Sequence, residues 1–215
     1  MSRARFIVGA DIGQAHDPTA LAVGELVERG FHLRHLERLP LGTPYPAIVE
    51  RIGATMKALP APGVLVVDAT GVGRPVLDML RAAGLDPIAV SITGGRAVTF
   101  DGNIWRVPKR ILVRALVTAF EGGRLKVARG LRYAGALTRE LHAFERRISA
   151  HGHDAYNGAG EHDDLVIAVA LATWWASAPH AGQPDITRQA AERRGAVGPA
   201  SGRRRNCLLG KTTEW

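Results

Sequence analysis

Cysteines and long apolar runs are both scarce in this sequence. Cys207 is the only cysteine, so no disulfide can form within one chain and no cysteine-based zinc site can be built. No stretch reaches the roughly 18–20 apolar residues that a membrane span needs, and residues 165–176 are typical of a buried helix instead. The basic start of the chain lacks the cleavage pattern of a signal peptide. We therefore expect a cytoplasmic protein with no membrane partner.

Acidic residues are also outnumbered. The chain of 215 residues has 20 Asp and Glu against 28 Lys and Arg, which gives a net charge of +8 and favours a polyanionic partner. With 46% apolar residues, it can bury the core of one ordinary domain. We assign this domain to residues 1–178. Residues 179–215 carry seven Lys or Arg against three Asp or Glu and no periodicity, which predicts a flexible basic tail.

The first 40 residues predict three antiparallel strands joined by short turns. The first strand ends at Asp11, and the next two cover residues 19–27 and 31–39. Further along, a strand at 64–67, a helix at 76–84 and a strand at 87–92 form a unit that implies parallel pairing. The fold class is therefore α/β, with a mixed sheet that is antiparallel at first and parallel afterwards, flanked by helices.

Apolar spacing predicts the remaining helices and loops. The expected helices cover residues 48–59, 108–122, 131–144 and 163–175, whereas residues 93–103 and 151–160 are expected to be loops. The loop at 93–103 should lie near the strand ends, because it follows a parallel strand.

Carboxylates stand at the ends of three apolar segments. Asp11 and Asp68 each close a predicted strand, and Asp163 and Asp164 open the last predicted helix. Each could be a simple turn or capping residue, but three such coincidences are better explained by a shared ligand. Converging carboxylates repel one another unless a hard divalent cation binds them. Mg²⁺ or Mn²⁺ suits these ligands, whereas zinc would recruit more His or Cys.

The two late aspartates differ in expected role. One of them can cap the helix while the other points outward. We assign the cap to Asp163 and the metal to Asp164, because Asp164 shares a helix face with the small Ala168. The reverse assignment stays open.

Several further residues are candidates for supporting roles. Four basic side chains could neutralise DNA phosphates or could form an ordinary solvated face: Arg96, Arg106, Lys109 and Arg110. His162 could contact a metal or the scissile phosphate, but a loop histidine before a cap is more often solvated or placed behind the ligands. Asp17 is most simply a turn former, with a possible metal contact.

Three motifs resemble the nuclease domain of large terminase subunits of tailed bacteriophages, which has a ribonuclease H-like fold. They surround Asp11-Ile12-Gly13, Val67-Asp68-Ala69 and His162-Asp163-Asp164, and the resemblance runs from about residue 5 to residue 177. It implies an endonuclease that cuts concatemeric double-stranded DNA in the host cytoplasm during genome packaging. It also implies that Asp11, Asp68 and the Asp163/Asp164 pair hold two metal ions, and that the partners include an ATPase motor, a portal and a small terminase subunit.

The chain departs from this family in one respect. Large terminases carry an ATPase motor, but the Gly-Lys-Thr run at 210–212 has Arg205 where a phosphate-binding loop needs its first glycine. We therefore expect a split nuclease module or a stand-alone relative. In the expected mechanism two ions about 3.5–4 Å apart bracket the scissile phosphate.

Three rival hypotheses stay open from the sequence. A resolvase or transposase-like nuclease would use the same acids on the same fold. An actin-like nucleotide-binding protein would use the glycine-rich turns after Asp11 and Asp68, although that fold needs two such domains. A noncatalytic basic DNA-binding module would use the acids as caps and turns, and metal would not matter.

Overall fold

The computed structural model describes residues 5–13, 17–28, 30–71, 73–150 and 163–177, with side chains up to Ala143 in the fourth of these ranges. The chain divides into two units, residues 1–179 and 180–215. All described residues belong to the first unit, so the predicted basic tail lies outside them. In this described part, no helix is long and apolar enough to cross a membrane.

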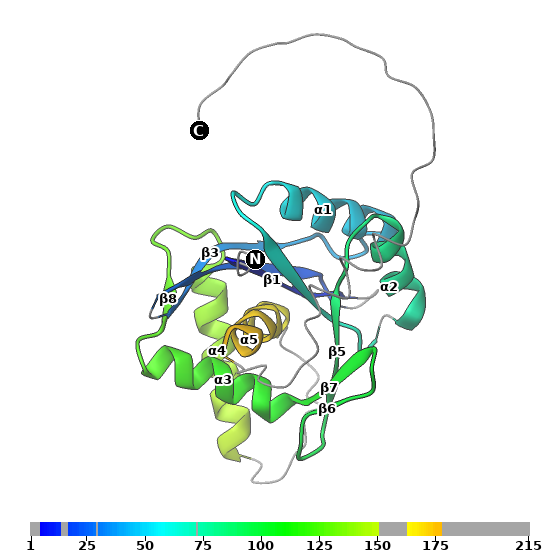
Figure 1. Ribbon diagram of the computed structural model, residues 1–215. Helices are drawn as coiled ribbons and strands as arrows, with labels where there is room; N and C mark the ends of the chain where they lie inside the picture. Colours follow the sequence, from blue (N-terminus) through cyan, green and yellow to red (C-terminus); the bar gives the residue numbers. More distant parts are fainter. Residues whose placement is uncertain (1–4, 14–16, 29, 72, 151–162, 178–215) are drawn as a thin grey trace, which may run out of the picture. The chain divides into compact units, whose positions relative to one another are not determined.

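One mixed sheet of eight strands carries the fold (Figure 1). The strands are β1 (Phe6–Asp11), β2 (Ala20–Val27), β3 (Gly30–Arg38), β4 (Gly63–Asp68), β5 (Ile88–Thr93), β6 (Thr99–Phe100), β7 (Ile104–Pro108) and β8 (Leu125–Val127). Their order across the sheet is β6-β7-β5-β4-β1-β2-β3-β8. Strands β1, β2 and β3 pair antiparallel, whereas β1 with β4, β4 with β5 and β5 with β7 pair parallel. The predicted mixed sheet is confirmed.

Within the described ranges, five helices cover the two faces of the sheet. They are α1 (Tyr45–Lys57), α2 (Gly73–Ala82), α3 (Lys109–Glu121), α4 (Ala134–Ala150) and α5 (Asp164–Ser177). Figure 1 shows α1 and α2 on one face and α3, α4 and α5 on the other. Because successive strand residues point to opposite faces, Ile7 packs into the core beside α5, while Val8 packs into the core beside α1 and α2. The sheet therefore separates two apolar cores.

The sequence prediction missed three short strands. Residues 93–103 were expected to be a loop, but Thr99–Phe100 forms β6 and pairs antiparallel with β7. The two residues of β6 are both exposed, so they show no alternation of apolar and polar side chains that would indicate a strand. Strands β7 and β8 are five and three residues long. In β7 the buried Trp105 stacks on Phe100, with ring centroids 4.4 Å apart.

Helix α5 packs directly on the backbone of the sheet. It is buried on all sides from Asp164 to Trp174, which explains why its sequence has no polar face. At Gly9 of β1, an added Cβ atom would lie 2.0 Å from the carbonyl oxygen of Ala168. Glycine at position 9 therefore allows the helix to approach β1, the strand that ends in Asp11.

The Gly9→Ala variant is expected to lower the free energy of unfolding by about 3 kcal/mol, the upper part of the range for overpacked cores, because backbone atoms must move to admit the methyl group. Urea denaturation measures this change. Gly53→Ala is the matched control, because Gly53 lies in α1 with nothing within 4 Å of an added Cβ. This variant should be more stable than the native chain, because alanine favours the helix. Equal effects of the two substitutions would contradict the close approach.

Candidate metal centre

Two carboxylates end neighbouring central strands of the sheet, and two more stand at the start of α5. Strands β1 and β4 are parallel neighbours in register up to Ala10 and Val67, so Asp11 and Asp68 come next on strands about 4.8 Å apart. Burial raises the pKa of Asp11 well above its ordinary value, and the charges of Asp68, Asp163 and Asp164 raise it further. The two strands that end in Asp11 and Asp68 are neighbours in the sheet. The charges of Asp163 and Asp164 also raise the pKa of Asp11, so both late aspartates lie within electrostatic range of it.

A threonine fixes the side chain of Asp68. The backbone N–H of Thr70 donates to Asp68 Oδ1 at 2.8 Å, and the Thr70 hydroxyl donates to the same oxygen. The Thr70 hydroxyl oxygen in turn accepts the N–H of Ile92 in β5 at 2.7 Å. These bonds lower the pKa of Asp68, but burial outweighs them and the pKa is raised. The turn interaction considered from sequence is therefore present, and it occupies one of the two carboxylate oxygens.

Asp163 lies immediately before α5 and pairs with a lysine. Its backbone carbonyl accepts the N–H of Ile167 at 2.9 Å, which is the first bond of the helix. Its carboxylate Oδ2 accepts a hydrogen bond from Lys109 Nζ at 2.7 Å. Lys109 is the first residue of α3, and its positive charge lowers the pKa values of Asp11 and Asp68. Lys109 thus partly offsets the negative charge of the cluster.

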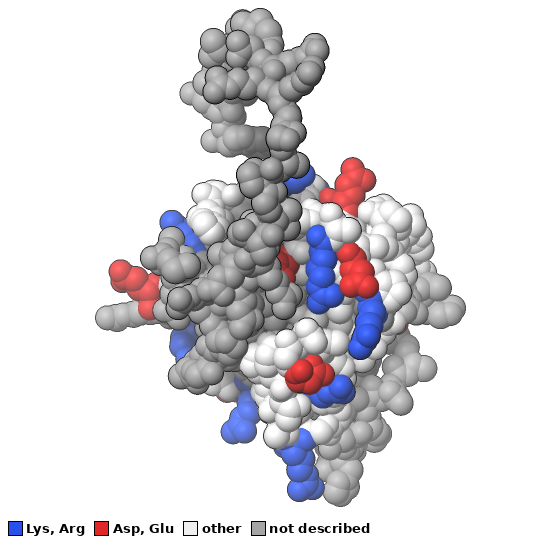
Figure 2. Space-filling view, turned by 45° about the vertical axis from the view of Figure 1, so that its right-hand side comes forward, with Lys and Arg blue, Asp and Glu red and all other residues white. Residues whose placement is uncertain are grey.

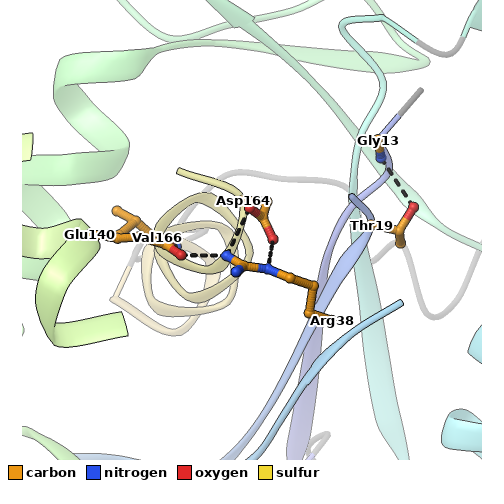
Figure 3. Close-up of polar contacts among 6 residues, drawn as sticks. All are labelled: Gly13, Thr19, Arg38, Glu140, Asp164 and Val166. Carbon is orange, nitrogen blue, oxygen red and sulfur yellow. Dashed lines mark hydrogen bonds and ion pairs between the residues drawn. The ribbon is translucent and has the colours of Figure 1, made fainter. Parts of the chain in front are cut away.

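Asp164 is held by an arginine from β3 (Figure 3). Arg38 donates to both oxygens of Asp164, from Nε at 2.7 Å and from Nη2 at 2.9 Å. Arg38 Nη2 also pairs with Glu140 of α4, and Glu140 Oε2 accepts the N–H of Val166 at 3.3 Å. Asp164 is only 3% exposed, and the positive charge of Arg38 compensates its negative charge within the protein.

The chemistry of these residues fits a hard divalent cation. The acids supply only carboxylate oxygens, the ligands that Mg²⁺ and Mn²⁺ prefer. Burial and the neighbouring acids raise the pKa of Asp11, although the positive charge of Lys109 lowers it. Within the described ranges, no three His, Cys, Asp or Glu side chains are already arranged to hold one ion. Asp68 and Asp163 each direct one carboxylate oxygen to a protein partner, Thr70 and Lys109 respectively.

The other predicted residues differ in exposure and contacts. Arg96, Arg106 and Arg110 are exposed; Arg110 Nη2 donates to the Arg96 carbonyl at 2.7 Å, and Arg106 lies 3.4 Å from Asp101. Asp17 is exposed. His162 lies outside the described residues. In the view of Figure 2, basic and acidic side chains stand beside one another among uncharged ones.

Sequence reasoning missed two polar residues that organise the cluster: Arg38 and Glu140. The turn at Thr70 is among the interpretations that the sequence offers for Asp68, because a threonine two positions after an aspartate commonly closes a turn with it. Arg38 and Glu140 gave no signal, since a charged residue at a strand end or on an amphipathic helix is ordinarily exposed.

Solved structures with a similar fold include nuclease domains of large terminases. Neither a family model nor a curated protein matches the chain. The large terminase nuclease of thermophilic phage G20c with bound magnesium is 24% identical, with a TM-score of 0.56 over 80% of this chain and 82% of that one. The manganese-soaked terminase nuclease domain of human cytomegalovirus is 15% identical, with a TM-score of 0.53 over 81% and 85%.

A longer neighbour extends the comparison. The large terminase of a second thermophilic bacteriophage, in complex with ATP-gamma-S, is 13% identical, with a TM-score of 0.57 over 80% of this chain and 40% of that one. The chain therefore spans less than half the length of this longer terminase. Together these structures show that this chain has the fold of terminase nuclease domains, and the predicted ribonuclease H-like fold is confirmed.

Proposed function

We propose that this chain is a metal-dependent endonuclease that cuts double-stranded DNA, of the type that acts in viral genome packaging. The observation that carries the proposal is the placement of Asp11 and Asp68 at the ends of adjacent strands, with Asp163 and Asp164 at the start of α5 near enough to raise the pKa of Asp11. The fold shared with terminase nuclease domains supports it. Mg²⁺ or Mn²⁺, as two ions, is the proposed cofactor; magnesium and manganese are named for the G20c and cytomegalovirus structures.

The proposed ligands are Asp11, Asp68 and Asp163. This reverses the roles expected for the late aspartates, because both oxygens of Asp164 accept bonds from Arg38 in a buried ion pair. Releasing Asp164 to a metal would leave Arg38 without that partner, which is costly in a buried site. Asp163 is half-buried, and its pairing with Lys109 is a single contact. Replacing the contact of Asp163 with Lys109 by a contact with a divalent ion would require a smaller rearrangement than breaking the ion pair of Asp164 with Arg38.

Each residue of the cluster has a proposed part in phosphodiester hydrolysis. Bound metal ions would activate a water molecule and stabilise the leaving oxygen. Thr70 orients Asp68 by holding Oδ1, and Lys109 supplies a positive charge beside the acids. The exposed side chains of Arg96, Arg106 and Arg110 are proposed to contact DNA phosphates, which would position the duplex without selecting its sequence.

The proposed partners are double-stranded DNA and packaging proteins, namely an ATPase motor, a portal and a small terminase subunit. The structure of the longer terminase includes ATP-gamma-S in a chain more than twice as long as the matched region. We propose that a separate segment or protein supplies the motor function and directs the cut.

Comparison of Asp163→Asn with Asp164→Asn tests the ligand assignment. Supercoiled plasmid is incubated with each variant and Mn²⁺ at a temperature where the variant is folded. Asp163→Asn should lower cleavage by about a thousandfold, because lost metal ligation removes several kcal/mol of transition-state stabilisation. Asp164→Asn should cleave at a rate near that of the native chain but unfold at a lower temperature. Loss of cleavage in Asp164→Asn but not in Asp163→Asn would restore Asp164 as the ligand. Absence of cleavage by the native chain in every metal would favour a noncatalytic DNA-binding module.

A further inference from the structure

The N-terminus of α5 is capped by a residue from another helix. Asp163 occupies the N-cap position, since its carbonyl accepts the first helical bond. An aspartate in this position ordinarily uses its carboxylate to accept the N–H of the second or third helical residue. The third residue is Val166, and its N–H donates to Glu140 Oε2 instead, whereas Asp163 Oδ2 accepts from Lys109.

Glu140 is well fixed for this role. Its side chain is 10% exposed, and its other oxygen pairs with Arg38, which also binds Asp164 at the start of the helix (Figure 3). One carboxylate oxygen therefore serves the helix end and the other serves the arginine. With both oxygens bound, the side chain has little freedom to move away from Val166.

We propose that Glu140 is a positioning residue that takes over the capping of α5 and so leaves the carboxylate of Asp163 available for metal. The proposal rests on the proposed function for its metal-binding half. Without Glu140, the N–H of Val166 would lack its acceptor, and an aspartate at the N-cap is well suited to replace it. Asp163 would then turn from the metal site towards the helix end.

A comparison of thermal unfolding tests the capping half without any metal. In the native background, Asp163→Ala should change the unfolding temperature little, because it removes a partly exposed ion pair and also a repelling carboxylate. In a Glu140→Ala background, Asp163 has become the cap, and Asp163→Ala should lower the unfolding temperature by about 2–4 °C. An equal change in both backgrounds would overturn the proposal.

Calorimetric titration with Mn²⁺ tests the metal half. Glu140→Ala should weaken Mn²⁺ binding about tenfold, the lower end of the effect of losing an outer-layer partner. Glu140→Gln retains an amide oxygen that can accept the N–H of Val166, and it should bind Mn²⁺ nearly as tightly as the native chain. This second variant also covers the case in which Glu140→Ala fails to fold.

Glu25→Ala is the matched control for general destabilisation. Glu25 is also a buried carboxylate bound by two arginines, Arg5 and Arg34, but it pairs with Phe6 at the start of β1, at the opposite end from Asp11. This variant should keep the native affinity for Mn²⁺. Native affinity in Glu140→Ala would overturn the metal half of the proposal. A native chain that binds no Mn²⁺ would overturn the proposed function, while the thermal comparison would still decide the capping.

Discussion

The Asp11→Asn variant is expected to lose metal-dependent cleavage and, in the absence of metal, to unfold at a higher temperature than the native chain. Asp11 lies among three other acids, and burial and their charges raise its pKa. The charged form that metal binding requires is therefore the form that destabilises the metal-free fold. An asparagine keeps the shape of the side chain without the charge, so cleavage should fall by about a thousandfold while stability rises.

The raised pKa of Asp11 also fixes the sign of the pH dependence. Between the ordinary carboxyl range and the raised pKa, the folded chain binds more protons at this site than the unfolded chain. The contribution of Asp11 to stability is therefore present at low pH and is lost as the pH rises through this window. Above it, the native chain should be less stable than Asp11→Asn.

Thermal unfolding of the native chain and Asp11→Asn in EDTA and in Mn²⁺, at several pH values, measures these effects. Mn²⁺ should raise the unfolding temperature of the native chain and leave that of the variant unchanged, because only the native site binds the ion. Asp78→Asn, at an exposed position on α2, should behave like the native chain. A variant that is less stable than the native chain at neutral pH without metal would contradict this explanation.

The Arg38→Met variant is expected to lower the free energy of unfolding by about 3–5 kcal/mol, as when one partner of a buried ion pair is removed. Arg38 binds Asp164 through two hydrogen bonds and also pairs with Glu140. Both carboxylates are largely buried, so methionine would leave two acids without their common cation. Urea denaturation of the full chain measures the difference.

Two comparisons distinguish the buried network from an ordinary surface pair. Arg51→Met removes an arginine that is 44% exposed and pairs with Glu37, and it should change stability by less than about 1 kcal/mol. The double variant Arg38→Met with Asp164→Asn should recover part of the loss, because one of the unpaired charges is gone. A loss for Arg38→Met no larger than that for Arg51→Met would mean that the network is not important for stability.

Much of the fold could be predicted because its strands are long apolar runs with clear ends. Residues 65–67 and residues 6–10 are buried as continuous apolar strands, and carboxylates at their ends are visible in the sequence itself. Short strands such as β6 could not be predicted, because two exposed residues form a strand only through their pairing with β7.

The separate roles of Asp163 and Asp164 could not be predicted from local sequence. The two residues are adjacent at a helix start, and both are aspartates, which suit capping and metal binding equally. What distinguishes them is Arg38, which is 126 positions away from Asp164 in the chain. Lys109, the partner of Asp163, is 54 positions away.

A β-bulge determines that Arg38 reaches the site. Near the β2–β3 turn, Leu26 pairs with Phe31, and unbroken pairing would place Glu37 opposite Ala20. The register shifts between Val23 and Gly24, so Arg38 stands opposite Ala20 instead, and Ala20 in turn pairs with Asp11. A slip of one residue exchanges the faces of a strand. The bulge thus places an arginine, rather than a glutamate, on the face that carries the acids.

Incubation of supercoiled plasmid with the native chain, in Mn²⁺ and in EDTA, tests the central claim most directly. The carboxylate cluster around Asp11 predicts nicked and linear DNA in Mn²⁺, intact plasmid in EDTA, and intact plasmid with Asp11→Asn in either condition. Cleavage that persists in EDTA or in Asp11→Asn would contradict a metal-dependent nuclease centred on Asp11.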